Sequence, residues 1–509
     1  MQVSRSEERA DEFSVQPIRR ARRKGPDVPR WVVALTILYC ALAAGVLLRW
    51  TASDWVPRTG DEPHYLVATR SLVERHSVDL EATYEEEFVN PEAFDGIPFG
   101  PAEAGPLNTH ADLGSDDRLY PIHGLGLSIL LVPGWIISGS FGAKLTMVLL
   151  SAGIVFVVAW ASARLIPQQV VAAATAIAVS VSTPLLVASS QIYPDLLVGT
   201  VPLAVFSVVM AGPRVRPAAV DGALAIAIGL LPWLHFKNFP ILLLCSSVLV
   251  VSLFESGSKK RAAAVVTIVT SFATALVVYN LATFGQISGW ATSAGAVGFT
   301  GSEVSTTSAM VFLGLHIDRA QGMFVQNPLL VLGCLEVAIR LLRREKWSIA
   351  YLVTYLLLVV PNATHPNWYG GYSFLGRFGW SASIFLMLAT VQGIARARLV
   401  APRCTYALLA GAIALQVIFL YGYVGPRPAP YNMPMDTPLS EYPSWWGPFG
   451  RFFPALYDRS TAVGIAQNWV GFGLLLCAIS TAAAWALRTR SDVESRLLKP
   501  APPARGIDL

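Results

Sequence analysis

Apolar stretches long enough to cross a lipid bilayer recur along the whole of this 509-residue chain. A hydrocarbon core of about 30 Å needs roughly 20 apolar residues in a helix. Charged residues make up 14% of the sequence, against about 25% in soluble domains. Only helices and closed barrels satisfy every backbone polar group inside a membrane, and these windows have helical length. The sequence therefore predicts an all-α polytopic membrane protein.

The apolar windows predict a bundle of about 12 transmembrane helices, within a range of 11 to 13. A further apolar segment, residues 124–139, is short and is interrupted by Pro133 and Gly134. We expect it to lie in the outer interface. The twelve windows are residues 31–49, 143–163, 170–190, 196–211, 219–234, 238–254, 262–283, 325–342, 347–362, 378–395, 404–424 and 468–487.

Basic residues between the windows predict the topology, because Lys and Arg accumulate in cytoplasmic loops. With segment 124–139 kept out of the count, the basic clusters fall on the cytoplasmic side. Both termini are then cytoplasmic, and the first window acts as an uncleaved signal anchor in a plasma or inner membrane. The expected parts are a basic tail (1–30), the first span (31–49), an extracytoplasmic loop with juxtamembrane helices (50–142), a bundle (143–487) with external loops 284–324, 363–377 and 425–467, and a second tail (488–509).

This topology places six polar clusters, each from a different loop, on the extracytoplasmic face. Ionisable groups at a membrane edge are costly and tend to mark function. We therefore expect the clusters to converge on one extracytoplasmic site. They are residues 61–65, 120–124, 191–195, 235–238, 316–322 and 365–377.

An acidic pair, Asp61 and Glu62, precedes Pro63 and a helical pattern. One carboxylate could simply cap that helix. The alternative is that one acts as a general base. Adjacent residues on a helix point about 100° apart, so we expect the two carboxylates to have different roles. His64 and Tyr65 follow directly and are candidate substrate-binding residues.

The later polar residues each have a structural and a functional interpretation. Asp195 either caps the helix that it begins, or orients an acceptor or shares a metal with the acidic pair. Lys237 either reaches the headgroups or binds an anion. Arg319 either pairs with Asp318 or binds an anion. Arg377 begins a span and is harder to explain as solvated surface. Together Lys237, Arg319 and Arg377 would give a phosphate charge-assisted hydrogen bonds.

The loop before Arg377 is rich in glycine and aromatic residues, among them Trp368 and Tyr369. Such a loop suits the C–H surface of a sugar, although an interfacial aromatic belt would have the same composition. His123 and His235 are further candidate binding residues. The histidines are scattered without metal-ligand spacing, so we expect no metal site. A divalent ion held by Asp61, Glu62 and a distant histidine is an alternative that no spacing supports.

With this topology the chain resembles the GT-C superfamily of integral-membrane glycosyltransferases, in particular the branch of protein O-mannosyltransferases and aminoarabinose transferases. The resemblance rests on Asp61 and Glu62 in a large first external loop, on the apolar segment that closes this loop, and on Asp195 at the start of the fourth span. It covers roughly the first 215 residues.

The resemblance implies a GT-C-like fold and a polyprenyl-phosphate sugar as donor. Asp61 would be the base on an acceptor hydroxyl of a glycan, lipid or protein, and attack would invert the anomeric carbon. Charge and sidedness make Lys237, Arg319 and Arg377 the candidates for stabilising the departing lipid phosphate. Membrane lipids are the other expected partners, and no nucleic acid is expected.

A transporter or flippase of lipid-linked sugars is the main alternative. Such a protein would place charged residues near the middle of its spans and often shows an inverted repeat. Here the spans are almost free of ionisable residues and the long loops share one face. A membrane scaffold without catalysis would leave the polar clusters unexplained.

The topology is checked with a reporter enzyme fused after residue 139. We expect it to report an extracytoplasmic location, because the basic clusters then remain cytoplasmic. A fusion after residue 260, within a basic cluster, is the control and should report a cytoplasmic location. A cytoplasmic signal from the first fusion would contradict the proposed convergence of the polar clusters on one face.

Overall fold

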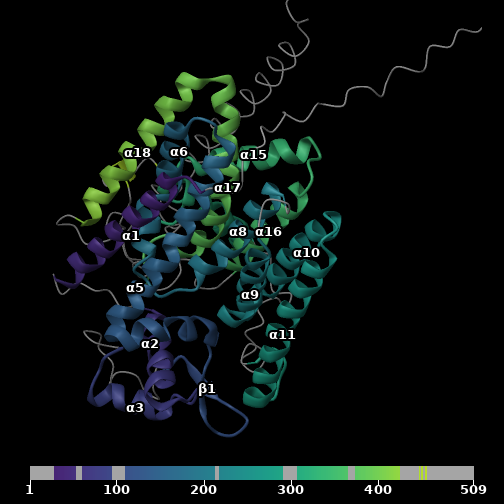
Figure 1. Cartoon of the computed structure of the whole chain (residues 1–509). Coiled ribbons are helices and arrows are strands. Elements are labelled where there is room, and N and C mark those ends of the chain that lie inside the picture. The colour runs from purple at the N-terminus through teal and green to yellow at the C-terminus, as the bar shows by residue number, and fades with distance from the viewer. Residues whose placement is uncertain are drawn as a thin grey trace, which may run out of the picture.

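A computed structural model of the chain describes residues 28–52, 60–93, 109–212, 217–289, 306–364, 373–424, 446, 449–450 and 453–454. The described chain is mostly helical. Long helices form a bundle, and a smaller part containing α2, α3 and β1 lies below one end of it (Figure 1). The window at 468–487 and both predicted tails lie almost wholly outside the described residues.

The smaller part comes from the loop after the first helix. Its elements are α2 (Glu62–Arg70), the π-helical turn η1 (Ser71–Arg75), α3 (Glu81–Val89) and a two-stranded antiparallel sheet of β1 (Ala111–Leu113) and β2 (Leu119–Pro121). The loop contains helices, and their expected juxtamembrane location stays a prediction. Its position outside the membrane stays a prediction.

The bundle contains the remaining helices. They are α1 (Arg30–Thr51), α5 (Leu125–Leu165), α6 (Gln169–Ser180), α7 (Thr183–Ala188), α8 (Asp195–Ala211), α9 (Ala218–Leu234), η3 (Phe236–Asn238), α10 (Phe239–Glu255), α11 (Lys259–Phe284), α13 (Thr306–Ile317), α14 (Met323–Gln326), α15 (Leu330–Leu342), α16 (Ser348–Ala363), α17 (Arg377–Val400) and α18 (Pro402–Val424).

Among the described residues, six helices are long and apolar enough to cross a membrane: α1, α5, η3 continued by α10, α11, α17 and α18. Four shorter apolar helices, α6, α8, α9 and α16, accompany them. The chain is therefore an integral membrane protein with a mostly helical fold. The number of about 12 spans, and the cytoplasmic location of both termini, remain predictions.

Two of the predicted spans are interrupted in the structure. Window 170–190 divides into α6 and α7, and window 325–342 begins in α14 and continues in α15. Proline accounts for both breaks, because it has no N–H to donate and its ring clashes with the carbonyl four residues earlier. Before Pro328 the backbone of Asn327 is also extended, as proline favours at the preceding residue. Pro184 is at the start of α7, and Pro328 separates α14 from α15.

The short apolar segment 124–139 forms the first part of α5, which bends sharply at Ser138 and Gly139. Residues eight apart in a straight helix are separated by about 12 Å along the axis. Here a Cβ on Gly142 would lie 1.9 Å from the carbonyl oxygen of Gly134. The two parts of α5 therefore cross with their backbones in contact, and the segment does not extend the following span.

The helix α17 lies at the centre of the bundle and is almost wholly buried. It packs against α8, α15 and α16. Glycines bring the backbones close together, with Gly199 of α8 against Ser381, Gly333 of α15 against Thr390, and Gly393 of α17 against Leu332. Small residues at such crossings are typical of membrane helix bundles, in which van der Waals packing drives association.

The bend in α5 gives a stability prediction. Gly142→Ala forces two backbones apart, so we expect it to destabilise the protein by about 1–3 kcal/mol, the usual cost of overpacking. Gly153→Ala in the same helix is the control. A Cβ there meets nothing within 4 Å, and alanine favours a helix by roughly 0.5–1 kcal/mol. Thermal unfolding in detergent measures both, and equal midpoints for the two variants would contradict the contact.

Candidate active site

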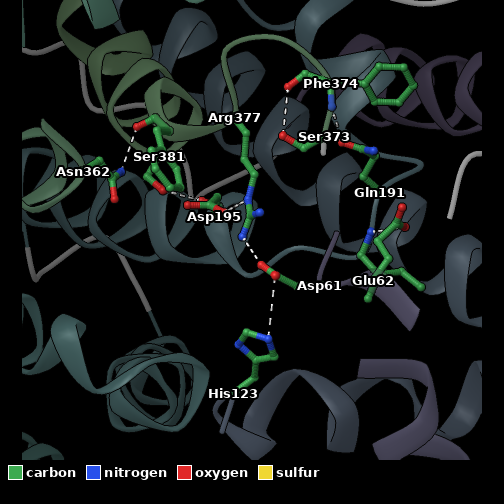
Figure 2. Close-up of polar contacts among 12 residues, drawn as sticks. Asp61, Glu62, His123, Gln191, Asp195, Asn362, Ser373, Phe374, Arg377 and Ser381 are labelled. Atoms are coloured by element: carbon green, nitrogen blue, oxygen red, sulfur yellow. Dashed lines mark hydrogen bonds and ion pairs between the residues drawn. The ribbon is translucent and has the colours of Figure 1, made fainter. Parts of the chain in front are cut away.

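Arg377, the first residue of α17, joins two carboxylates from distant parts of the chain. Its Nη2 donates to Oδ2 of Asp61 at 2.7 Å, and its Nε donates to Oδ2 of Asp195 at 3.3 Å (Figure 2). The guanidinium lies over the ring of Tyr193, 3.6 Å from its centroid. A planar guanidinium suits this arrangement, because it binds carboxylates and stacks on an aromatic ring at once.

The backbone before Arg377 is held by amide side chains. The N–H of Phe374 donates to Gln191, and the N–H of Gly376 donates to Oε1 of Gln321 at 2.8 Å. Gly376 has a φ of +85°, and a Cβ there would lie 1.9 Å from Nε2 of Gln326. Only glycine fits this position. The turn therefore starts α17 with Arg377 directed at the two carboxylates.

Asp61 stands at the N-cap position of α2, but its side chain makes no capping hydrogen bond. The capping interpretation is therefore wrong for this side chain, which contacts Arg377 instead. Asp195 is the first residue of α8, and the cap position belongs to Pro194. Burial is the largest single effect and would raise the pKa of the Asp61 carboxyl. The charge and hydrogen bond of Arg377, together with His123 and His110, outweigh burial and hold this pKa well below the usual range. Asp61 is therefore an anion at neutral pH.

Two histidines approach the other oxygen of Asp61. His110 precedes β1 and His123 follows β2, so the antiparallel pairing of the strands brings them together. Nδ1 of His110 lies 3.5 Å and Nε2 of His123 lies 3.8 Å from Oδ1 of Asp61. Burial lowers the pKa of His110, and it lowers that of His123 to about 4. Both rings are therefore neutral at neutral pH.

Neighbouring aromatic rings hold the two histidines. The ring of His64 stacks on His110 with centroids 3.7 Å apart, and Nδ1 of His64 hydrogen-bonds the Tyr84 hydroxyl at 2.8 Å. Burial lowers the pKa of His64 well below its usual value. Tyr65 stacks on His123, with centroids 5.0 Å apart. His64 and Tyr65, expected to bind substrate, thus support the histidines that face Asp61.

Glu62 points away from Asp61 and is fully buried. Its Oε1 accepts from Nζ of Lys144 at 2.9 Å and from the backbone N–H of Ile192 at 2.7 Å. Lys144 also donates to the carbonyl of Ser190 at 3.0 Å. This ion pair joins α2 to α5 and to the segment before α8. The adjacent carboxylates therefore contact different partners, and Glu62 is placed to hold the fold.

A second cation, Lys237, lies on the far side of Asp195. Asp195, His235, Lys237 and Asn362 line one small cavity. Nζ of Lys237 donates to Oδ1 of Asn362 at 3.0 Å, and Asn362 in turn donates to the carbonyl of Phe378. His235 accepts from the backbone N–H of Lys237. Asn362 thus directs Lys237 inward. Contact with the lipid headgroups, the structural interpretation, would need the side chain to point outward.

Arg319, Trp368 and Tyr369 are the remaining predicted residues. Arg319 lies in the turn between α13 and α14, where its backbone N–H donates to the carbonyl of Pro454. Trp368 and Tyr369 lie outside the described residues.

Sequence reasoning missed several residues of the site. His110 is one of the scattered histidines, Tyr193 belongs to the cluster at residues 191–195 without being a candidate of its own, and Asn362 ends an apolar window. Lys144 carried a usable signal, because a lysine in an apolar helix needs a partner. The approach of His110 to His123 could have been inferred only with the strand pairing known.

The cluster as a whole lies where α2, α8 and α17 begin, next to the turn η3. It combines two carboxylates, Asp61 and Asp195, with Arg377, Lys237 and two neutral imidazoles. The fold and this site define an integral membrane protein with a cluster of paired charged side chains where its helices begin.

No protein-family model matches the sequence, and no curated protein matches it. Among solved structures, the chain is similar to the crystal structure of ArnT from Cupriavidus metallidurans in the apo state, with 15% identity and a TM-score of 0.43. The match covers 77% of this chain and 65% of that chain, just under two thirds of its length. A similarity at this level assigns neither a family nor an activity.

The buried pair of Glu62 and Lys144 gives a second stability prediction. Lys144→Met leaves the Glu62 carboxylate buried without a counter-charge, so we expect a loss of about 3–5 kcal/mol. The double variant Glu62→Gln with Lys144→Met should recover part of it. Lys346→Met, which breaks the exposed pair with Glu255, is the control and should cost at most about 1 kcal/mol. Thermal unfolding measures all three, and a midpoint for Lys144→Met equal to that of the control would contradict the role of the pair.

Proposed function

We propose that this protein is a membrane glycosyltransferase of the GT-C type. It transfers a sugar from a polyprenyl-phosphate donor to an acceptor hydroxyl on the extracytoplasmic face, with inversion of the anomeric carbon. The observation that carries this proposal is the position of Asp61. Its carboxylate is ionised, its side chain is 22% exposed, and it lies beside the cations that a phosphate leaving group needs.

Asp61 is the proposed general base. Its Oδ2 is bound by Arg377, and its Oδ1 is directed to the side of the histidines. An acceptor hydroxyl would donate to Oδ1. The oxygen of that hydroxyl attacks the anomeric carbon while the bond from this carbon to the phosphate oxygen breaks. The proton passes to Asp61, and the electron pair leaves with the phosphate.

Arg377 and Lys237 are the proposed phosphate-binding residues. Negative charge grows on the leaving phosphate in the transition state, and fixed cations stabilise that charge. Both cations are near Asp195. Arg377 contacts it directly, and Lys237 lines the same small cavity as Asp195. Arg319 is the third cation proposed from charge and sidedness, and the contacts above favour the other two.

The pairing of Arg377 with Asp61 suggests how the base becomes active. A carboxylate held far below its usual pKa is a weak base, because proton transfer is most efficient when the pKa lies near the working pH. An anionic phosphate competes with Asp61 for the guanidinium. Binding of the donor would therefore weaken the contact and raise the pKa of Asp61 when the base is needed.

The proposal is tested with purified protein in lipid nanodiscs and a panel of polyprenyl-phosphate sugars. Release of polyprenyl phosphate is followed for the wild type and for Asp61→Asn. We expect the variant to lose roughly 10²- to 10⁴-fold in rate, the range for removal of a general base. Asp117→Asn is the control, because Asp117 is exposed in the same loop and has a φ of +61° that asparagine adopts readily.

Two outcomes would contradict the proposal. Asp61→Asn with wild-type activity would exclude Asp61 as the base. A wild-type protein that consumes no donor, but moves lipid-linked sugar across the bilayer of sealed vesicles, would identify a flippase.

A further inference from the structure

The β1–β2 hairpin brings two histidine nitrogens and one carboxylate oxygen together. Nδ1 of His110 lies 2.9 Å from Nε2 of His123, and Oδ1 of Asp61 lies 3.5 Å and 3.8 Å from them. These three atoms come from residues that are far apart in the sequence, at the start of α2 and on either side of the hairpin. Each atom is a potential metal ligand, and all lie within 4.8 Å of one another.

The separations fit a common ion. Ligands bound tetrahedrally to zinc at about 2.0–2.2 Å lie roughly 3.3–3.6 Å from one another. The two distances from Asp61 Oδ1 are close to this value. The distance between the imidazole nitrogens is shorter by a few tenths of an ångström, so the rings would have to separate slightly on binding. Without an ion, a hydrogen bond between the two rings accounts for the same contact.

Each of the three side chains is held by a second contact. Oδ2 of Asp61 is bound by Arg377 at 2.7 Å, which leaves Oδ1 directed to the histidines. His110 stacks on His64, and the His110 N–H donates to Nδ1 of His64 at 3.3 Å. Tyr65 stacks on His123. Outer contacts of this kind fix the orientation of metal ligands and raise affinity.

The site has room for a further ligand. The side chains of Asp61, His110 and His123 are 22%, 29% and 18% exposed. Three protein ligands with an open fourth position are typical of metal sites that bind a water or a substrate oxygen.

Charge also allows a cation here. Arg377 approaches Asp61, but it is shared with Asp195, so these three side chains together carry a net negative charge. A metal ion on the other side of Asp61 would therefore not be repelled by a net positive charge.

We infer that Asp61, His110 and His123 form a binding site for one divalent transition-metal ion, with Zn²⁺ as the best match. Two imidazoles and one carboxylate suit zinc and its first-row neighbours, whereas magnesium and calcium prefer oxygen ligands alone. This site differs from the ion considered from the sequence, because Glu62 points away from it. The inference rests on side-chain geometry and does not depend on the proposed transferase activity. An ion bound to Oδ1 of Asp61 would compete with an acceptor hydroxyl for that oxygen.

The test measures metal binding directly. Protein purified with a tag that contains no histidine is stripped with a chelator, and Zn²⁺ is titrated against it by calorimetry. Co²⁺ provides a second readout through its visible absorption. We expect one ion per chain, absorption bands of four- or five-coordinate Co²⁺, and weaker binding of Mg²⁺.

Variants locate the ion. His110→Ala and His123→Gln each remove a proposed ligand. Loss of an outer contact alone lowers metal affinity roughly 10- to 100-fold, so we expect each variant to bind Zn²⁺ at least that much more weakly. His76→Asn is the control, because His76 is exposed directly after η1 and its φ of 52° suits asparagine. It should bind as the wild type does. Thermal unfolding without metal checks that each variant is folded.

Several results would overturn the inference. They are a wild-type protein without stoichiometric Zn²⁺ or Co²⁺ binding, His110→Ala and His123→Gln variants that bind like His76→Asn, or tighter binding of Mg²⁺ than of Zn²⁺. The wild-type titration alone decides the matter if a variant fails to fold. None of these results depends on whether a sugar donor is consumed.

Discussion

The guanidinium of Arg377 contacts Asp61, 316 residues earlier in the chain, and Asp195, 182 residues earlier. Three helices therefore begin at one point, because α2, α8 and α17 each place a charged group at or next to their first residue. Burying a charge is costly unless it is paired and hydrogen-bonded. Arg377 lies at the start of a buried helix, and the two carboxylates beside it offset the cost of burying its charge. The electrostatics of the whole site follow from this cation.

The same requirement explains why the smaller part of the protein stays attached to the bundle. Glu62 and Lys144 form a second buried pair, between α2 and α5, directly beside the first. Neither pair is evidence of large net stability, since burial costs about as much as the attraction returns. Their effect is to specify position. Breaking either pair leaves a buried charge without its partner. The helix α2 therefore has one favourable position on the bundle, and this position also fixes Asp61.

Much of the architecture could be predicted from the sequence because it depends on local composition. Apolar length predicts membrane helices, and the polar residues between them predict where chemistry can occur. The predicted windows did not include the helix breaks near Pro184 and Pro328, because apolar composition does not register the effect of a single proline. Of the candidate site residues, Asp61, Asp195, Lys237 and Arg377 lie in one neighbourhood. The part played by His110 was not recognised, because hairpin pairing is a tertiary constraint with weak sequence signals.

The sequence by itself determined that this chain is a membrane protein with mostly helical spans, since the hydrophobic effect and the bilayer thickness act on composition and length. It also indicated Asp61 and Glu62 as a pair with divided roles, since adjacent helical residues point in different directions. Only the tertiary structure decided which partners each of the two residues contacts. Asp61 meets Arg377 and the two histidines, whereas Glu62 meets Lys144. The reason is physical: the pairing of a buried charge depends on the segments that fold against it, and these lie more than 80 residues away along the chain.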